Sequence, residues 1–424
     1  MRNDGITIDD SQMNYEDSDS FNGLTSEEEV ESSEKDVNGS ANIIYYTTEF
    51  DLMSLAWRIE DEEIIVPSFI KNKKISNEQT DKEGNKFRNF QRGFVWGLRQ
   101  KQNLIDSILK GYPMPGIFLL TQKDGTFLVL DGQQRLTTIA QFRAGDFSVD
   151  TSSIRDIGFA VEDENKEYKY DDLDGILKRR FNNYRISATI IDDILPKSSD
   201  SIPNNSGISS DAEDYIYSIF GRLNSGGTQL TPHEIRISVY SGKLADKINE
   251  LNTGEKWRSL YRGELQKRSR DHEVISRIIA MYLNRENYKG GQKEYLNKFY
   301  RVYRNFDSPE IQHAVERFSQ VIDTVHPIGP KLFRTPGTSN VNAAWTEAII
   351  SSTMVILDSY PNIDSDKLRE AVENTQHELM NGKKYSVYGE EKSLKDFITS
   401  NTSSKVSYFG RFEICYISLQ EHLK

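Results

Sequence analysis

An apolar stretch that runs directly into a polar turn carries the clearest chemical signal of this chain. Residues 126–130 (TFLVL) predict a strand, and a predicted helix that ends at Gly145 begins after Gly132. The free N–H groups of a first helical turn and the helix dipole attract an anion. The junction Asp131–Gly132–Gln133–Gln134–Arg135 therefore predicts an anion site.

Each residue of this junction has a chemical role in that interpretation. Gly132 would let a ligand approach the backbone closely, and Gln133 and Gln134 would donate side-chain N–H groups. Arg135 would clamp phosphate oxygens, and Asp131 would hold Mg²⁺ or orient a water molecule. The alternative is a structural Asp N-cap followed by ordinary surface side chains.

Two further segments contain polar residues in an unusual context. Gln91 and Arg92 lie within FQRGFVW (90–96), whose aromatic residues favour a core position. The segment FGRLNSGGTQLT (220–231) places Asn224 and Gly226 directly after a predicted helix, where two glycines permit unusual backbone angles. A plain helix C-cap is the alternative for the second segment.

These segments together resemble the N-terminal domain of GmrSD-type modification-dependent restriction enzymes, in the ParB/sulfiredoxin-like superfamily. The matching pieces are FQRGFVW, LIDSILKGYPMP (104–115), FLVLDGQQRLTTI (127–139) and FGRLNSGGTQLTPHEIR (220–236). Their order and spacing agree over about residues 50–240. The family's usual Pro before Gln–Arg is Asn89 here, whereas the DGQQR motif is intact.

The resemblance implies a domain that binds and hydrolyses a nucleoside triphosphate with Mg²⁺. It places Asp131, Gln133, Gln134 and Arg135 in catalysis, with Asp131 also at the metal. The residues expected to complete the nucleotide pocket are Gln91, Arg92, Gly132, Thr137, Asn224 and Gly226. Sulfiredoxin chemistry is excluded, because it needs a cysteine at the phosphate loop and the single cysteine is Cys415.

The histidines do not form a nuclease pattern. The chain has six, none of them paired at i, i+4, and we find no His-Asn-His cluster. His233 follows Thr231–Pro232, an N-cap and first-position proline, and is expected to be a first-turn residue rather than a metal ligand. Relatives carry a C-terminal HNH nuclease domain that this chain is expected to lack, so that cutting would need a separate effector nuclease.

Charge is distributed unevenly along the chain. The net charge is −12, yet residues 1–50 alone carry 13 acidic and two basic residues, whereas 255–305 carries 13 basic and six acidic ones. Basic charge interleaved with aromatic residues predicts contact with nucleic acid, and Lys267, Arg268 and Arg270 form the densest run. Helices with a solvated charged face and an aromatic core face are the alternative. An acidic tail could compete with DNA for this stretch.

We therefore predict an α+β fold, with a ParB/sulfiredoxin-like N-terminal domain followed by an all-helical C-terminal domain. The expected boundaries are a disordered acidic tail (1–42), an NTP-binding domain (43–242) and a helical domain (243–424). Without a membrane span or secretory signal, we expect a cytoplasmic protein. The expected function is a nucleotide-dependent DNA-sensing component of bacterial or phage defence. A non-catalytic adaptor that recruits the nuclease, and a homo-oligomer, remain open alternatives.

Overall fold

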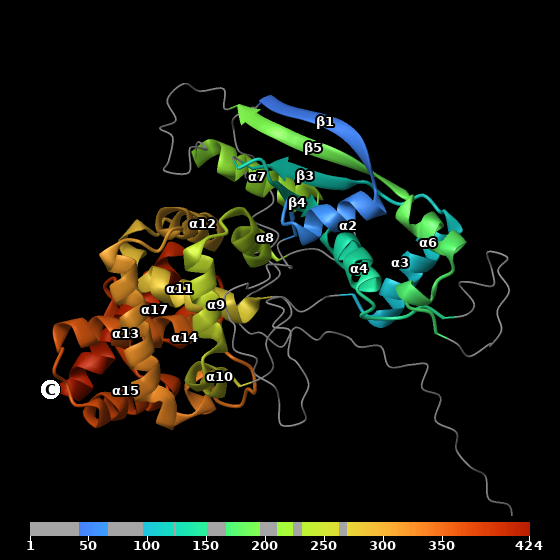
Figure 1. Cartoon of the computed structure of the whole chain (residues 1–424). Coiled ribbons are helices and arrows are strands. Elements are labelled where there is room, and N and C mark those ends of the chain that lie inside the picture. Colours follow the sequence, from blue (N-terminus) through green and yellow to red (C-terminus); the bar gives the residue numbers. More distant parts are fainter. Residues whose placement is uncertain are drawn as a thin grey trace, which may run out of the picture.

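The computed structural model describes most of the chain. The described residues are 42–66, 96–122, 124–150, 167–195, 210–223, 231–262 and 269–424, with the backbone alone at 42, 193–195 and 210–214. They form an α+β part followed by a largely helical part, as the sequence predicts (Figure 1). None of the helices within these ranges combines the length and apolar character needed to cross a membrane.

A five-stranded mixed sheet organises the α+β part. Its strands are β1 (Asn42–Asp51), β2 (Ile64–Ile65), β3 (Ile117–Thr121), β4 (Phe127–Asp131) and β5 (Arg185–Leu195). The order is β1-β5-β3-β4-β2. The hairpin β3–β4 is antiparallel, whereas β3 pairs in parallel with β5. β4, which leads directly into the turn before α4, lies between β3 and β2 in this order.

Alternating apolar residues give the sheet two buried faces. On one face, Leu119 and Val129 pack with α2 (Leu52–Glu60), α3 (Leu98–Lys110), α4 (Gln133–Arg143) and α6 (Gly175–Asn182). On the other, Leu120, Leu128 and Leu130 belong to the same core as α7 (Ser210–Leu223) and the helical part. Successive side chains of β3 and β4 point to opposite faces of the sheet. These two strands therefore contribute to both cores and join the α+β part to the helical part.

The helical part surrounds one almost completely buried helix, α14 (Ala343–Ser359). Helices α11 (Arg270–Asn284), α13 (Pro309–Val325) and α17 (Lys405–Leu423) pack against it (Figure 1). The remaining elements are α8 (Pro232–Val239), α9 (Lys243–Thr253), α10 (Glu255–Tyr261), α12 (Gln292–Tyr303), α15 (Ser365–Met380), α16 (Lys395–Ile398) and the hairpin β6 (Lys384–Val387)–β7 (Glu390–Ser393). This hairpin was not expected in an all-helical domain.

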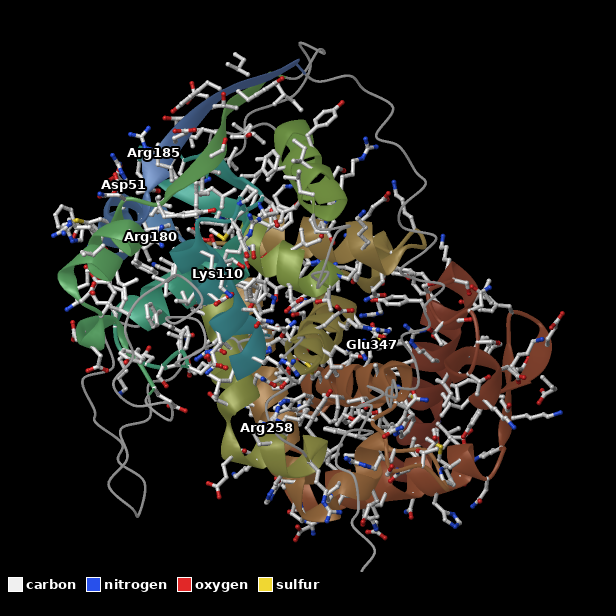
Figure 2. All side chains as sticks on the ribbon, turned by 90° about the vertical axis from the view of Figure 1, so that its right-hand side faces the viewer. Asp51, Lys110, Arg180, Arg185, Arg258 and Glu347 are labelled. Carbon is white, nitrogen blue, oxygen red and sulfur yellow. The ribbon has the colours of Figure 1, made fainter. Side chains whose placement is uncertain are left out.

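A charged triad lies in the centre of this helical part. Glu347, which lies among the helices of this part (Figure 2), accepts hydrogen bonds through Oε2. The donors are Arg277 Nη2 at 3.1 Å and Arg411 Nη2 at 2.8 Å. No side chain of the three is more than 2% exposed. The triad therefore links α11, α14 and α17 through buried hydrogen bonds.

The strand predicted at 126–130 is observed at Phe127–Asp131, and the helix predicted to end at Gly145 ends at Arg143. β2 consists of Ile64 and Ile65 alone, and residues 67–95 lie outside the described residues. β1 was not expected, because its run of apolar residues merges with the polar tail. Its first residue, Asn42, falls on the predicted boundary of that tail.

Candidate functional site

The turn between β4 and α4 has the geometry that only glycine adopts without strain. Gly132 has φ +96° and ψ 6°, and a Cβ atom there would lie 2.5 Å from Ile117 Cγ2. The first intrahelical bond runs from Leu136 N–H to Gly132 O at 2.9 Å. The N–H groups that precede Leu136 have no intrahelical acceptor, so that the turn presents donors at the positive end of α4.

Arg135 does not project freely toward a ligand. Its Nη2 donates to Asp131 Oδ2 at 2.7 Å, and its Nη1 donates to the carbonyl groups of Pro115 and, at 2.9 Å, Gly116. Its side chain is only 12% exposed, and this burial lowers the pKa of the guanidinium although Asp131 opposes the effect. Arg135 therefore holds β4, α4 and the segment before β3 together.

The two glutamines of the turn differ in environment. Gln133 is buried, and its Nε2 donates to Val129 O at 3.3 Å, so that this side chain supports the strand that precedes the turn. Gln134 is half-buried, and its Oε1 atom is buried with no hydrogen-bond partner among the described residues. Thr137 is buried one turn further along α4. Of these side chains, Gln134 is the one that offers an unused polar atom.

The segment before β3 is fixed from the opposite side as well. Tyr184 Oη donates to Tyr112 O at 2.5 Å. A Cβ atom at Gly116 would lie 2.8 Å from Ser187 O, so this glycine lets the segment lie against β5. Sequence reasoning missed this support of the turn. The only signal was the small, turn-forming sequence MPG immediately before the strand.

Several residues predicted for the site lie outside the described residues. These are Gln91, Arg92, Asn224 and Gly226. The elements next to them are described, since Trp96 precedes α3, and the stretch that contains Asn224 joins α7 to Thr231. α7 packs against β4 and β5. The structure thus brings Asp131, Gly132, Gln133, Gln134 and Arg135 together and leaves the other two motifs as predictions.

Helix α8 ties the end of this domain into the helical part. Thr231 is the N-cap, as predicted, and it also forms a capping box with Glu234. Arg236 is buried, and its Nε donates to Asn297 Oδ1 at 2.9 Å while its Nη1 lies 3.1 Å from His233 Nδ1. Tyr217 Oη of α7 donates to Pro232 O at 2.9 Å. A hydrogen-bonded path therefore leads from α7 through α8 to α12.

His233 is a buried first-turn residue, as expected. Within the described residues, no group of three or more His, Cys, Asp or Glu side chains could hold a metal ion. Asp131, 31% exposed, is the carboxylate at the β4–α4 turn, and one of its oxygens is bound to Arg135. A single carboxylate is compatible with Mg²⁺, which is often held by one or two carboxylates together with substrate phosphates.

The proposed nucleic-acid stretch, 255–305, is mostly core. The aromatic residues expected to stack on bases were Tyr261, Tyr282, Tyr288, Tyr295, Phe299, Tyr300 and Tyr303, and all but the half-buried Tyr303 are buried. That part of the prediction is wrong, because their helical spacing points them inward. Some basic residues are also engaged: Arg258 Nη1 donates to Asp271 Oδ2 at 2.8 Å, and Arg304 Nε donates to Ser241 O.

Of the densest basic run, one member is described. Arg270 is half-buried at the first position of α11. Lys267 and Arg268 lie outside the described residues, so their contact with nucleic acid stays a prediction.

One known protein family matches the part of the chain that contains the β4–α4 turn. Residues 66–241 match the model of the GmrSD restriction endonuclease N-terminal domain. The chain carries a GmrSD-type N-terminal domain. The family associates the chain with restriction-like defence systems. The matched range contains the DGQQR turn and ends two residues after α8. No curated protein matches the chain.

Proposed function

We propose that the GmrSD-type domain binds a nucleoside triphosphate at the β4–α4 turn and hydrolyses it, as the sensing component of a restriction-like defence system. One observation carries the proposal: Gly132 opens α4 in a left-handed conformation, packed against Ile117. The first N–H groups of α4 precede its first intrahelical hydrogen bond, which runs from Leu136 N–H to Gly132 O. Phosphate oxygens suit such a site.

The charge balance at the turn constrains how phosphates would be held. The positive charge of Arg135 is matched by Asp131, so this pair adds no net charge. A triphosphate would need further neutralisation from Mg²⁺ and from Arg92, which we propose for the same pocket. The remaining oxygen of Asp131 is the described group suited to the metal, which when bound would neutralise phosphate charge and activate water.

Gln134 is the residue suited to recognise a part of the ligand other than phosphate. Its buried Oε1 accepts no hydrogen bond from the described residues. A buried acceptor that gains a donor on ligand binding contributes to affinity, since its desolvation has already occurred in the free protein. A hydroxyl or amino group of the nucleotide would supply that donor. Gln133 would instead position the turn.

The helical part would respond to whether a nucleotide is bound at the β4–α4 turn. The stretch that contains Asn224 connects α7 to α8, and α8 is buried through Arg236 among residues of the helical part. A change at the nucleotide would therefore act on α8 and, through Asn297, on α12. We propose that this change alters binding of DNA or of an effector nuclease. Arg270, with Lys267 and Arg268, remains the proposed DNA contact.

Phosphate release tests the enzymatic part of the proposal. The purified chain is incubated with each of the four NTPs and Mg²⁺, with and without DNA. We expect release that is lost in Asp131→Ala and retained in Asp124→Ala, a matched carboxylate whose described bonds are to Thr126 in the β3–β4 hairpin. Equal release by both variants would refute the role of Asp131.

A non-catalytic adaptor is the second candidate, and the ion pair between Asp131 and Arg135 favours it. One carboxylate oxygen of Asp131 is already bound to Arg135 Nη2, so fewer of its acceptor positions remain for a metal ion or a water molecule. In the adaptor, nucleotide binding alone would switch the helical part. Nucleotide binding by the wild-type chain without any phosphate release would support this candidate over the NTPase.

A further inference from the structure

The helices on one face of the sheet have an outer surface with an exposed tryptophan. Leu55 and Ile59 of α2 enter the core, which leaves Met53 and Trp57 on the outer side of the helix. Trp57 is 50% exposed. Arg143 of α4 lies next to it, because its guanidinium is 5.9 Å from the centre of the Trp57 ring and its Nη1 donates to Met53 O at 3.4 Å. The indole is therefore presented to solvent beside a cation.

Helix α6, which contacts α2, adds positive charge to the same layer. Leu177 and Phe181 enter the core, whereas Arg179 and Arg180 are exposed and Lys178 is half-buried. α6 lies on the side of the α+β part that is remote from the helical part (Figure 1), and Figure 2 shows Arg180 there. We call the surface formed by Trp57, Arg143, Lys178, Arg179 and Arg180 the α2–α6 face.

Carboxylates do not match the positive charge of the α2–α6 face. Helices α2, α4 and α6 together contain six basic residues and one acidic residue, Glu60. Two of the six are paired, Arg58 with Glu63 and Arg135 with Asp131. The other four are the cations of the α2–α6 face, and none of them forms an ion pair with a carboxylate of the described residues.

The acidic residues of this region lie at the opposite end of α6. Asp171 and Asp172 precede the helix, and Asp174 caps its start by accepting from its first N–H groups. Arg179 and Arg180 belong to the last turn. The positive charge therefore gathers at the C-terminal end of α6.

We propose that the α2–α6 face binds single-stranded nucleic acid, with Arg179 and Arg180 at phosphate groups and Trp57 stacked on an unpaired base. Cations without carboxylate partners are complementary to a phosphate backbone. An exposed indole offers a flat face on which a base of any identity can stack. The bases of a duplex are already paired and stacked on one another, so Trp57 favours a single strand.

This surface is distinct from the sites proposed above. Arg143 lies in the last turn of α4, whereas the nucleotide would bind at the first turn, about 15 Å away along the helix. Arg270 belongs to the helical part. Binding at the α2–α6 face therefore requires neither nucleotide hydrolysis nor the basic run next to Arg270.

The chain's own acidic N-terminal segment is the competing occupant. Residues 1–41 are rich in Asp and Glu, and they join β1 at Asn42. Asp51, the N-cap of α2, is at the other end of this strand, about 30 Å away. Carboxylates would use the cations alone, whereas a nucleic acid also uses the exposed ring of Trp57. The combination of both features favours nucleic acid.

Fluorescence anisotropy with the full chain, in the absence of NTP, tests the role of Trp57. The probes are a labelled DNA strand of about 20 nucleotides, longer than a typical binding site, its duplex, and an abasic strand of equal length. We expect the ordinary strand to bind more tightly than the duplex. Trp57→Ala should weaken binding of the ordinary strand about tenfold and leave the abasic strand unchanged, whereas Trp57→Phe should keep most of the affinity. Tyr360→Ala, at an exposed aromatic residue of the helical part, is the control.

Salt dependence tests the phosphate contacts. Arg179→Gln/Arg180→Gln should weaken binding of the ordinary and the abasic strand alike. It should also reduce the slope of log K against log salt by about 1.4, since each phosphate contact to a single strand contributes about 0.7. Lys384→Gln/Lys395→Gln, at two exposed positions of the helical part, should leave the slope unchanged.

Three outcomes would overturn the proposal. Equal affinity of the wild type and the variants at Trp57 and at Arg179 and Arg180 would place any binding elsewhere. A loss in Trp57→Ala that is as large for the abasic strand as for the ordinary one would exclude base stacking. A full chain that binds no strand until residues 1–41 are removed would show that its own acidic segment occupies the α2–α6 face.

Discussion

Arg135 Nη2 lies 2.7 Å from Asp131 Oδ2, so that the third residue of α4 is paired with the last residue of β4. The same guanidinium also binds the carbonyl groups of Pro115 and Gly116. Arg135, which was expected to clamp phosphate, therefore binds groups of the protein itself and supports the local structure. Its contribution to nucleotide binding would come mainly through the position of the turn.

Replacement of Arg135 by lysine should destabilise the turn although the charge is kept. An ammonium group lacks the planar fork that binds a carboxylate and two carbonyl groups at once. Loss of one or two buried hydrogen bonds predicts a fall of about 1–3 kcal/mol in the free energy of unfolding, measured by urea denaturation. Arg143→Lys, in the last turn of the same helix, is the control and should change little. Equal effects would contradict the framework role.

Gly132→Ala should have a larger effect than an alanine at another left-handed glycine. Both Gly132 and Gly145 have positive φ, but a Cβ atom at Gly145 has nothing within 4 Å. Gly145→Ala should cost about 1–2 kcal/mol from the backbone conformation alone. At Gly132 the overlap with Ile117 should add about 1–3 kcal/mol. The difference in urea midpoints measures this extra cost, and its absence would mean that the turn has room for a side chain.

Arg236→Met should weaken the coupling between the α+β part and the helical part, so that the two parts unfold in separate transitions. The substitution leaves Asn297 and His233 buried without the guanidinium that binds them. Removing one member of a buried charged network typically costs about 3–5 kcal/mol. Arg179→Met, at an exposed position of α6, should have almost no effect. Two transitions in place of one, by circular dichroism and tryptophan fluorescence, would indicate that α8 couples the parts. A minor effect would argue against that coupling.

The helical part should lose stability in acid partly through Asp271. Burial would raise the pKa of this carboxyl, but hydrogen bonds from His272 and Asn252 and the charge of Arg258 outweigh burial and hold the pKa well below its usual range. Its contribution is complete above about pH 4, the pKa of an unfolded aspartate, and is lost as pH falls toward the folded value.

Urea midpoints between neutral pH and pH 3 test this contribution. Asp271→Asn should lower stability at neutral pH and weaken the dependence on acid. Asp323→Asn, which removes an exposed partner of Lys256, is the control and should leave the acid dependence unchanged. A variant at Asp271 with the wild-type acid dependence would refute the assignment.

Much of the fold could be predicted from the sequence, because local patterns decide it. The apolar runs 117–121 and 126–130 and the Thr231–Pro232 cap correspond to the observed hairpin and helix start. Gly132 was recognised as a site of close approach, but its tight contact with Ile117 depends on the tertiary structure. The same is true of Arg135, whose carbonyl partners are about twenty residues away in the chain.

For the aromatic residues of 255–305, the prediction from the sequence is wrong. Their composition suggested a binding surface, whereas packing places them in the core, as for Tyr288 and Tyr408, whose rings stack at 3.7 Å. Composition alone does not distinguish a stacking platform from a core helix, since both require aromatic side chains beside basic ones. The α8 network was missed because Arg236 and Asn297 are 61 residues apart.

Nucleotide binding at Gln134 tests the central claim most directly. We would measure the affinity of each NTP with Mg²⁺ by isothermal titration calorimetry for the wild type, Gln134→Ala and Gln141→Ala. Gln141, on the same helix, accepts from Lys101 Nζ at 3.0 Å and is distant from the turn. We expect a loss of about tenfold or more in Gln134→Ala, corresponding to about 1.4 kcal/mol, and wild-type affinity in Gln141→Ala. Absence of NTP binding by the wild type, or equal binding by all three proteins, would contradict the account.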